Sequence, residues 1–420
     1  MKPLNQTKLN RRHWLTETAA ASATGFAFSA GWSVIPARAL GSNDRIGLGF
    51  IGTGARANAH IDICLKMKEV GRCEIVALCD VYRPRLEAAA QKTGAKVYRH
   101  YRDLLADPNV DSVCIATPDR HHAPQALDAL RAGKDVFVEK PLTHWSQMDL
   151  ATQLAQEAEK RRAIVQVGTQ YVADDAYAKA RELIRQGLVG KIVHVQLGYF
   201  RRGDWGERMP IPDPHAKPGP DLDWEQFLGD APRVPFDVSR FFQWRLYWDY
   251  AGGPATDLLV HAFTPVFCLL ELDYPERVLG GGGTFQYPRE VPDQCNIIAD
   301  YPGGPSVVMC NSLSNYTGIQ TILRGTEGAV LLGDLDHPGK GIRIVPVGKE
   351  SEEILIPWTS FGSTVKLWDN FLDCVRTRQR PYSPLDIGVR VQAPLNMGIL
   401  SHREGKVARF DRQSGRILLG

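Results

Sequence analysis

From residue 45 to residue 163, short apolar runs alternate with longer segments in which alanine is mixed with charged residues. The apolar runs are rich in Val, Ile and Phe, a composition that favours strands, whereas the Ala-rich segments favour helices. The predicted strands are 45–51, 74–79, 97–98, 112–117 and 135–138, and the predicted helices are 85–92 and 123–132. Strands separated by such helices predict an α/β fold with a doubly wound, parallel sheet of the Rossmann type.

The pattern changes after residue 163. Residues 164–168, 176–185 and 192–197 predict a strand, a helix and a strand, and later apolar runs are broken by Gly and Pro turns. The later predicted strands are 278–287, 294–301, 306–312 and 319–325. We expect the helix 363–376 and the segment 384–396 to return to the first domain. The predicted divisions are a Rossmann domain over 45–163, an α+β domain over 164–383 and a returning segment over 384–420.

Length and composition agree with two domains. The chain has 420 residues, which is more than a single hydrophobic core usually serves. Hydrophobic residues make up 44% and charged residues 23%, which is typical of globular proteins. The net charge of +3 lacks the strong basic excess of a nucleic-acid-binding protein, so we expect no nucleic-acid partner.

The first 39 residues hold five basic residues and one acidic residue, and without them the net charge is −1. Arg11 and Arg12 precede the weakly apolar stretch 19–35, and Ala37-Arg38-Ala39 resembles a signal-peptidase site. This order predicts a twin-arginine signal peptide over 1–39, and therefore periplasmic or other export through the twin-arginine machinery. An amphipathic helix and an uncleaved membrane anchor are the alternatives. No later segment approaches the roughly 18 apolar residues of a membrane span, so we expect no stable membrane insertion.

The eight cysteines are scattered along the chain, without paired or zinc-type spacing. We therefore expect neither a disulfide scaffold nor a metal site.

A glycine turn follows the first predicted strand. Gly52-Thr53-Gly54-Ala55-Arg56-Ala57 fits the pattern G-x-G-x-x-G/A, in which the glycines allow a tight turn and close approach to a pyrophosphate. Asp80 ends the next long strand, where a carboxylate accepts hydrogen bonds from the adenosine ribose and favours NAD. Arg56 and Arg83 are close enough in sequence to meet a 2′-phosphate, so the choice between NAD and NADP stays open.

Polar residues follow the other predicted strands, at the sheet edge where open α/β folds bind ligands. The candidate cofactor-binding residues are Gly52, Thr53, Gly54, Ala55, Arg56, Asp80, Thr117, Pro118, His121, Glu139, Lys140 and Gln170.

Four segments occur at characteristic separations: GFIGTGARA (49–57), CDVY (79–82), ATPDRHH (116–122) and VEKPL (138–142). Together they resemble the glucose–fructose oxidoreductase, inositol dehydrogenase and MocA (Gfo/Idh/MocA) family, and the resemblance extends from about residue 45 to the end. It implies a C-terminal α+β domain with a large, mostly antiparallel, open sheet. It also implies NAD- or NADP-dependent hydride transfer at a carbinol of a sugar or polyol. The free face of that sheet is a usual dimer surface in the family, so we expect a homodimer or homotetramer.

The resemblance implies catalytic roles for three residues. Lys140 matches the EKP lysine, which lies beside the nicotinamide, polarises the reacting oxygen and helps to move its proton. Asp257 and His261 match the family's Gly-Gly…Asp-x-x-x-His element, in which the histidine exchanges the substrate's proton and the aspartate orients it or binds substrate. The spacing places both on one face of a helix, and imidazole titrates near neutrality, as proton transfer requires. A solvated helical pair is the alternative for two such residues taken alone.

Residues 201–220 are rich in Gly and Pro, which predicts a lid, a binding loop or a contact arm. The block 224–250 is dense in Trp, Phe, Tyr and Arg, which suits a carbohydrate, although core or oligomer contacts explain any single aromatic residue equally well. The candidate substrate-binding residues are Lys140, Tyr199, Arg201, Arg245, Trp248, Asp257 and His261.

These patterns predict an exported NAD(P)-dependent oxidoreductase of sugars or polyols, in which His261 and Lys140 handle the hydroxyl proton. Export implies a cofactor that is bound beforehand and recycled in place. A redox-neutral, NAD-dependent glycoside hydrolase or lyase that oxidises C3 transiently is the alternative, although the histidine-rich element of such glycosidases is not evident. A non-catalytic sugar-binding protein is the third hypothesis, which the presence of Lys140, Asp257 and His261 disfavours.

Overall fold

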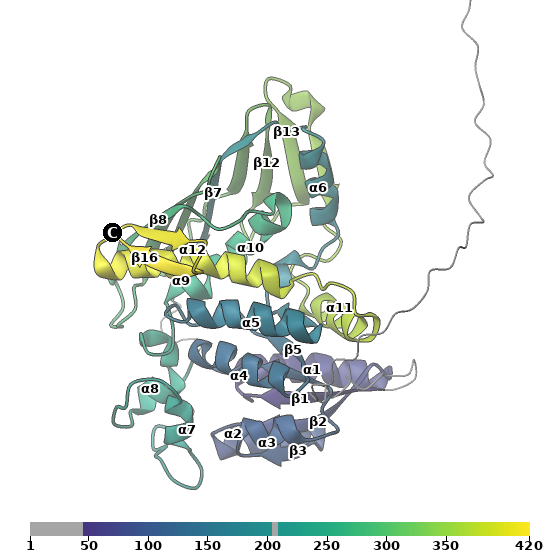
Figure 1. Cartoon of the computed structure of the whole chain (residues 1–420), viewed down its shortest axis with the longest axis vertical. Coiled ribbons are helices and arrows are strands. Elements are labelled where there is room, and N and C mark those ends of the chain that lie inside the picture. Colours follow the sequence, from purple (N-terminus) through teal and green to yellow (C-terminus); the bar gives the residue numbers. More distant parts are fainter. Residues whose placement is uncertain (1–44, 204–208) are drawn as a thin grey trace, which may run out of the picture. The chain divides into compact units, whose positions relative to one another are not determined.

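The computed structural model describes residues 45–203 and 209–420 (Figure 1). The predicted signal peptide, residues 1–39, lies outside the described residues, as does the 204–208 part of the predicted lid. Within the described ranges, no helix is both long enough and apolar enough to cross a membrane.

Six parallel strands form the first sheet, in the order β3-β2-β1-β4-β5-β6. Successive side chains point to opposite faces, so Phe137 lies in one apolar core and Val136 and Val138 lie in the other. Burial on both faces is typical of a parallel sheet and confirms the predicted doubly wound fold. The strands are β1 (Ile46–Ile51), β2 (Cys73–Cys79), β3 (Lys96–Tyr98), β4 (Ser112–Ile115), β5 (Asp135–Val138) and β6 (Val165–Val167).

Helices cover both faces of this sheet. One face carries α1 (Ala55–Glu69), α2 (Arg83–Thr93) and α11 (Thr364–Thr377), and the other carries α3 (Tyr101–Ala106), α4 (Asp119–Arg131) and α5 (Met148–Arg161). The predicted division at residue 164 was wrong in one respect, because β6 pairs in parallel with β5 and belongs to the first sheet. All three residues of β6 are buried, which explains why its apolar run resembles the other central strands.

Ten strands form the second sheet, in the order β14-β13-β12-β11-β7-β10-β9-β8-β15-β16. Only β7 and β10 pair in parallel, and the other neighbours are antiparallel, as the resemblance implied. The strands are β7 (Ile192–Phe200), β8 (Arg277–Gly283), β9 (Gln294–Asp300), β10 (Ser306–Ser312), β11 (Thr321–Gly325), β12 (Gly328–Gly333), β13 (Gly341–Pro346), β14 (Ile354–Pro357), β15 (Ala408–Asp411) and β16 (Arg416–Leu419).

One face of the second sheet packs on α6 (Ala176–Arg185), α10 (Leu259–Leu270) and α12 (Leu385–Glu404). The other face is open: on β9, Ile297 is fully buried whereas the next residue, Ile298, is 43% exposed. The short elements of the chain are η1 (Gln170–Val172), α7 (Trp224–Leu228), α8 (Val238–Phe242), η2 (Trp244–Leu246), α9 (Pro254–Asp257) and η3 (Glu350–Glu352).

The strand predicted over 278–287 is shorter in the structure, because β8 ends at Gly283. Beyond it, the backbone N–H groups of Phe285, Gln286 and Tyr287 all donate to Oδ2 of buried Asp293, at 2.7–3.0 Å. These three N–H groups bond to a carboxylate instead of to a neighbouring strand. The apolar pattern of the sequence does not show this change of partner, so it could not predict that β8 ends at Gly283.

Helix α12 belongs to two cores (Figure 1). Leu385, Val389 and Ala393 lie in the core of the first domain, with side chains of α5. Ile387 and Val391, on the other side of the helix, lie in the core of the second domain, with side chains of α10. The returning segment predicted over 384–396 therefore packs on both sheets.

Gly280 of β8 lets α12 approach the second sheet closely. A Cβ at Gly280 would lie 1.8 Å from the carbonyl oxygen of Gly398. We expect Gly280→Ala to lower the free energy of unfolding by about 1–3 kcal/mol, because overpacking displaces backbone, as urea denaturation would measure. Gly281→Ala is the matched control: nothing lies within 4 Å of its added Cβ, so a change within about 0.5 kcal/mol is expected. Equal losses in the two variants would contradict this account.

Candidate functional site

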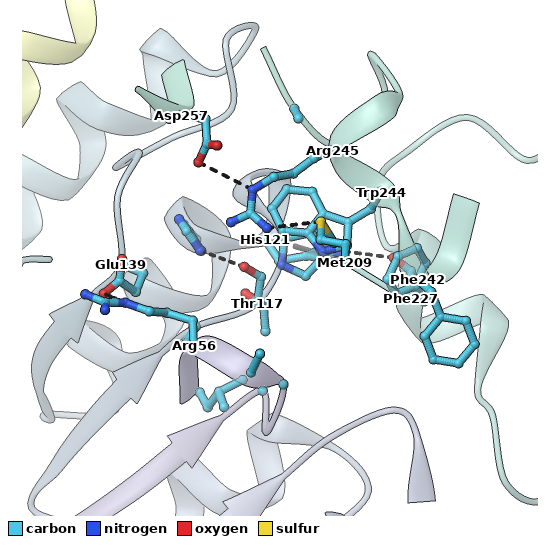
Figure 2. Close-up of a pocket in the computed structure, with 18 of the residues that line it drawn as sticks. Arg56, Thr117, His121, Glu139, Met209, Phe227, Phe242, Trp244, Arg245 and Asp257 are labelled. Carbon is cyan, nitrogen blue, oxygen red and sulfur yellow. Dashed lines mark hydrogen bonds and ion pairs between the residues drawn. The ribbon is translucent and has the colours of Figure 1, made fainter. Parts of the chain in front are cut away.

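A cavity of about 1340 Å³ lies at the carboxyl ends of β1, β2, β4 and β5. Its other walls come from helices of the first domain and from the second domain, including residues 209–250, which we call the covering segment. Figure 2 shows Phe227, Phe242 and Trp244 of this segment across the cavity from Arg56 and Glu139. All the predicted site residues except Thr53 and Trp248 line this cavity.

The glycine turn shapes the cavity at the end of β1. Gly52 has a φ of 87°, and a Cβ there would lie 2.8 Å from the carbonyl oxygen of Ala116, so glycine is required. At Gly54, which precedes α1, an added Cβ would meet no atom within 4 Å. No side chain caps α1 and its first turn holds no acidic residue. This open helix N-terminus fits the pyrophosphate of a dinucleotide.

Asp80 is fixed by the glycine turn and by the chain that follows it. Its Oδ2 accepts hydrogen bonds from the N–H and Oγ1 of Thr53, at 2.7 and 2.9 Å, and its Oδ1 accepts from the N–H of Tyr82 at 2.8 Å. Thr53 is fully buried behind the cavity wall, so its contact is with Asp80. The carboxylate stays at the wall, where its oxygens have further acceptor capacity for ribose hydroxyls.

The arginines that the sequence offered to a 2′-phosphate make other contacts. The Nε of Arg56 donates to Oε1 of Glu139 at 2.8 Å, and Arg83 forms an ion pair with Asp221. Arg85, which sequence reasoning did not single out, lines the cavity with its guanidinium 5.0 Å from the ring centre of Phe242.

Glu139 is a buried anion held by two donors. Its Oε1 accepts from Nε2 of His60 at 2.7 Å as well as from Arg56. Because the indole of Trp368 donates to Nδ1 of His60 at 2.8 Å, the proton of this imidazole lies on Nε2. Burial raises the pKa of Glu139, but Arg56 and His60 outweigh it and hold the pKa well below its usual range. Glu139 therefore stays ionised.

Lys140 joins the two domains across the cavity. Its Nζ donates to Oδ1 of Asp257 at 2.5 Å and to the carbonyl oxygen of the same residue at 2.9 Å. The Nε of Arg245 lies 3.4 Å from the same Oδ1 (Figure 2). Burial raises the pKa of Asp257, but Lys140 and then Arg245 lower it well below its usual range. One carboxylate thus faces two cations.

The helix expected to carry both Asp257 and His261 is interrupted. Helix α9 ends at Asp257, Leu258 has a φ of −109°, and α10 begins at Leu259. The hydrogen bonds of Asp257 go to Lys140 and Arg245, and none goes to His261. Asp257 was expected either to orient the imidazole of His261 or to bind substrate. The structure shows no direct hydrogen bond between Asp257 and His261 that would support the first role.

The imidazole of His261 has no hydrogen-bond partner among residues 45–203 and 209–420, and it is only 8% exposed. Tyr171 packs edge-on against it, with ring centres 5.2 Å apart. Burial and, next, the charge of Lys140 lower the pKa of His261 well below 6.5. A neutral, unengaged imidazole at the cavity wall can accept a proton from a ligand.

The remaining predicted residues divide between the cavity and its surroundings. Arg201 stacks its guanidinium 4.6 Å from the ring centre of Tyr199 and contacts the tyrosine hydroxyl. Trp248 lies outside the cavity, with its indole against Trp145 and under the guanidinium of Arg403. Other predicted residues at the cavity wall are Thr117, Pro118, His121 and Gln170.

The covering segment is hydrogen-bonded to the first domain beside Asp80. The N–H of Asp223 donates to the carbonyl of Val81 at 2.9 Å, and the N–H of Arg83 donates to the carbonyl of Asp221 at 2.8 Å. The chain that follows Asp80 is therefore paired with the second domain by its backbone.

A second attachment involves the start of α4. Nε2 of His121 donates to the carbonyl of Phe227 at 2.8 Å, and a Cβ on Gly229 would lie 2.8 Å from this ring. Arg120 donates to Oδ1 of Asp230 at 2.8 Å and to the carbonyl of Asp249 at 3.2 Å. Sequence reasoning selected His121 for the cofactor, and the structure shows that it also holds the covering segment.

Several residues of the site carried no signal in the sequence. Arg289 lines the cavity from the loop after β8, and Tyr171 lies on a short 3₁₀ helix. Trp244 belongs to the aromatic block, from which the sequence analysis had chosen Trp248 instead. Asp119 is buried near Lys140 and Asp257, and burial raises its pKa to about 8.

No group of His, Cys, Asp or Glu in the described part of the chain could hold a metal ion.

Residues 46–169 match the family model described as an oxidoreductase family with an NAD-binding Rossmann fold (GFO/IDH/MocA). Residues 227–331 match the model of the GFO/IDH/MocA C-terminal domain.

Individual relatives agree with these matches. An inositol 2-dehydrogenase of Rubrobacter xylanophilus is 33% identical over 165 residues, 39% of this chain and 46% of that protein. A glycosyl hydrolase family 109 protein of Shewanella pealeana is 31% identical over 227 residues, 47% of each chain. The matched part of this chain thus spans about half the length of these curated relatives.

A solved structure supports the fold over a longer range. The WlbA dehydrogenase of Bordetella pertussis, in complex with NADH and UDP-GlcNAcA, has a TM-score of 0.64 and 21% identity. The alignment covers 88% of this chain and 99% of that chain. At this identity the likeness concerns the fold.

Arg120 fastens the covering segment without lining the cavity. We expect Arg120→Ala to increase amide hydrogen exchange in residues 222–231 about tenfold or more, because charge-assisted hydrogen bonds are lost. Arg233→Ala is the control, since its ion pair with Glu225 is exposed and lies within the segment itself. Unchanged exchange in Arg120→Ala would show that the segment is held by other contacts alone.

Five buried or partly buried histidines give the protein a defined acid sensitivity. Burial lowers their pKa values below 6.5, to about 4 for His121 and about 3 for His144. The other three are His60, His122 and His261. Because the unfolded chain binds a proton at each site below about pH 6.5 and the folded chain does not, stability falls as the pH falls through this range.

The expected slope is up to about 1.4 kcal/mol per pH unit for each histidine, measurable by urea denaturation between about pH 7 and pH 5. His144→Gln is expected to reduce the slope of the free energy of unfolding against pH by the contribution of one histidine, up to about 1.4 kcal/mol per pH unit. His337→Gln, at a side chain that is 83% exposed, is expected to leave the slope unchanged. Parallel curves for all three proteins would refute the assignment.

Proposed function

The chain belongs to the GFO/IDH/MocA oxidoreductases, whose NAD-binding and C-terminal domains match residues 46–169 and 227–331, and we propose that it acts on a carbinol of a sugar or polyol with a bound nicotinamide dinucleotide. One arrangement carries this proposal. The Lys140–Asp257 pair and the unengaged imidazole of His261 share a cavity whose far end is the glycine turn.

The proposed chemistry depends on the charge of these side chains. When bound, the nicotinamide supplies the acceptor or donor of the carbinol hydride. His261, kept neutral by burial and by Lys140, accepts the hydroxyl proton on a ring nitrogen. The Nζ of Lys140, held by Asp257, stabilises the negative charge that develops on the oxygen as its proton leaves. In the reverse direction the same groups return the proton.

We further propose NAD as the cofactor. Asp80 presents a carboxylate to the ribose. Arg56 and Arg83, the two arginines that could have met the 2′-phosphate of NADP, are instead paired with Glu139 and Asp221, respectively. The NADH in the WlbA complex is consistent with this choice. The attachments of the covering segment favour a cofactor that stays bound, which suits the export predicted from residues 1–39.

A redox-neutral glycoside hydrolase is the second candidate, supported by the likeness to a glycosyl hydrolase family 109 protein. There the same residues would move a proton while the substrate is oxidised and later reduced again. A sugar-binding protein without turnover is the third candidate. The three candidates differ in net redox change, in bond cleavage and in turnover.

The test uses the mature holoprotein, purified from a strain with active export and checked for bound nucleotide. It is incubated with sugars, polyols and aryl glycosides while nicotinamide absorbance and aglycone release are followed. A net absorbance change supports the dehydrogenase, and aglycone release without a net change supports the hydrolase. Binding without either signal would contradict both enzymatic proposals.

Lys140→Ala and His261→Ala are each expected to lower turnover at least about 100-fold, because general acid–base groups contribute this much, and to leave the nucleotide bound. His337→Ala, at an exposed histidine, is the control and is expected to keep full turnover. Nucleotide content is measured for every variant. Loss of nucleotide together with turnover would reassign Lys140 or His261 to cofactor binding.

A further inference from the structure

The imidazole of His261 is held in place without a hydrogen bond. In the described parts of the chain no donor or acceptor meets its ring, and Nδ1 is fully enclosed, so Nε2 is the nitrogen left to face the cavity. Histidines that transfer protons are usually oriented by a hydrogen bond at the nitrogen that does not react. Asp257, the carboxylate expected for that task, bonds to Lys140 and Arg245 instead. Packing contacts must therefore fix the ring.

Tyr171 makes such a contact. Its ring centre lies 5.2 Å from that of His261 and the two ring planes stand at 83°, a perpendicular arrangement that aromatic rings prefer. Turning the imidazole about its side-chain bonds would break this arrangement. Tyr171 and His261 both line the cavity, so their contact lies at its wall rather than deep in a core.

Tyr171 is in turn held by a row of aromatic rings. Its ring packs on Phe361, with ring centres 5.3 Å apart. Phe361 packs on Trp358 at 4.8 Å, and Trp358 packs on Tyr177 of α6 at 5.4 Å. Tyr177 is buried in the core of the second domain. The row thus connects the imidazole to closely packed side chains, which resist displacement.

A buried carboxylate fixes the loop of Phe361 to the segment that carries Tyr171. Oδ2 of Asp174 accepts hydrogen bonds from the N–H of Thr359 at 2.8 Å and from the N–H of Ser360 at 2.6 Å. Asp174 and Ser360 are 186 residues apart in the chain. Hydrogen bonds to a carboxylate are strong, so the position of Phe361 against Tyr171 is well defined.

Building on the proposed function, we propose that Tyr171 is a positioning residue for proton transfer: its perpendicular ring contact, supported by Phe361, keeps the imidazole of His261 turned so that Nε2 meets the substrate hydroxyl. An aromatic ring differs from a carboxylate in this place. A carboxylate bonded to Nδ1 would stabilise the imidazolium, whereas an aromatic ring orients the imidazole, excludes water and adds no charge. The base is thereby directed while it stays neutral.

The charges around His261 come from other segments. Burial is the largest cause of its lowered pKa, and Lys140 lowers the pKa further. Asp257 and Glu139 raise the pKa of His261, and Arg56 lowers it. These four residues remain when a variant changes only the aromatic contact. A rise in the pKa of His261 in such a variant therefore reports that water has reached the imidazole.

The kinetic test uses the holoprotein and the substrate found in the turnover assay. Tyr171→Leu is expected to lower kcat about 10- to 100-fold and to leave KM within about threefold, because a misplaced base reacts slowly while the substrate still binds. Tyr171→Phe, which keeps the ring, is expected to restore kcat to within about threefold of the wild-type value. Phe361→Leu, which removes the ring behind Tyr171, is expected to lower kcat about threefold.

Tyr316→Leu, at a tyrosine that is 71% exposed, is the matched control and is expected to keep full turnover. Circular dichroism and nucleotide content confirm that each variant is folded and loaded.

A titration that needs no substrate observes the imidazole directly. Protein labelled with ¹³C at Cε1 of histidine is followed by NMR from about pH 5 to pH 8, and His261→Ala identifies the signal. The pKa of His261 is expected to stay well below 6.5 in the wild-type protein and in Tyr171→Phe, and to move toward 6.5 in Tyr171→Leu. Since the neutral imidazole is the base, the acid limb of the kcat–pH profile is expected to move to higher pH in Tyr171→Leu as well.

The outcomes separate this inference from the function on which it rests. If Tyr171→Leu matches the wild-type protein in kcat and in the titration, the positioning role is refuted and the proposed function stands. If Tyr171→Phe is as slow as Tyr171→Leu, the hydroxyl acts instead of the ring, and the assignment is overturned. A fall in kcat without a change in the pKa of His261 would indicate a general structural loss and would refute the role too. If no substrate reacts with the wild-type protein, the proposed function fails, and the titration alone decides whether Tyr171 holds the imidazole.

Discussion

Two adjacent residues of opposite charge, Glu139 and Lys140, are buried where β5 ends, and the site is organised by the way each finds its counter-ion. Glu139 is neutralised from within the first domain by Arg56 and His60. Lys140 is neutralised from the second domain by Asp257. Because an unpaired buried charge costs several kcal/mol, neither residue can occupy this place without its partner. This end of the cavity is thus assembled only when both domains are in position.

The covering segment extends the same relationship to the other end of the cavity. It adds backbone hydrogen bonds to the chain after Asp80 and side-chain bonds to Arg120 and His121. The second domain therefore contacts the first at both ends of the cavity. A single substitution in this segment can alter the cavity wall without changing Lys140 or His261, which complicates any assignment of roles from activity alone.

The sequence was most informative where local rules dominate. Helix 176–185 was predicted with its observed ends. The glycine turn was also recognised: Gly52 has a positive φ, and the space beside the Cα of Gly54 is free of protein atoms. Such signals depend on a few neighbouring residues. Local patterns therefore identified the fold and the glycine turn that lines the cavity.

Features set by distant contacts were less predictable. The partner of Asp257 could not be read from its spacing to His261, because Lys140 is 117 residues away. The sequence selected Trp248 from the aromatic block as a substrate-binding candidate, yet Trp244 lines the cavity and Trp248 does not. Arg289 carried no pattern at all. Each of these depends on how the two domains meet, which the order of residues along one strand or helix does not encode.

Helix α12, which contributes Leu385 to one core and Ile387 to the other, constrains how a ligand can enter. A clamshell motion of two rigid lobes would pull apart side chains on one face of this helix and expose them to water. The two domains are therefore joined along α12, and a rigid-body opening of the cavity would expose one of its two apolar faces. A local movement of the covering segment, in contrast, would leave both apolar cores intact.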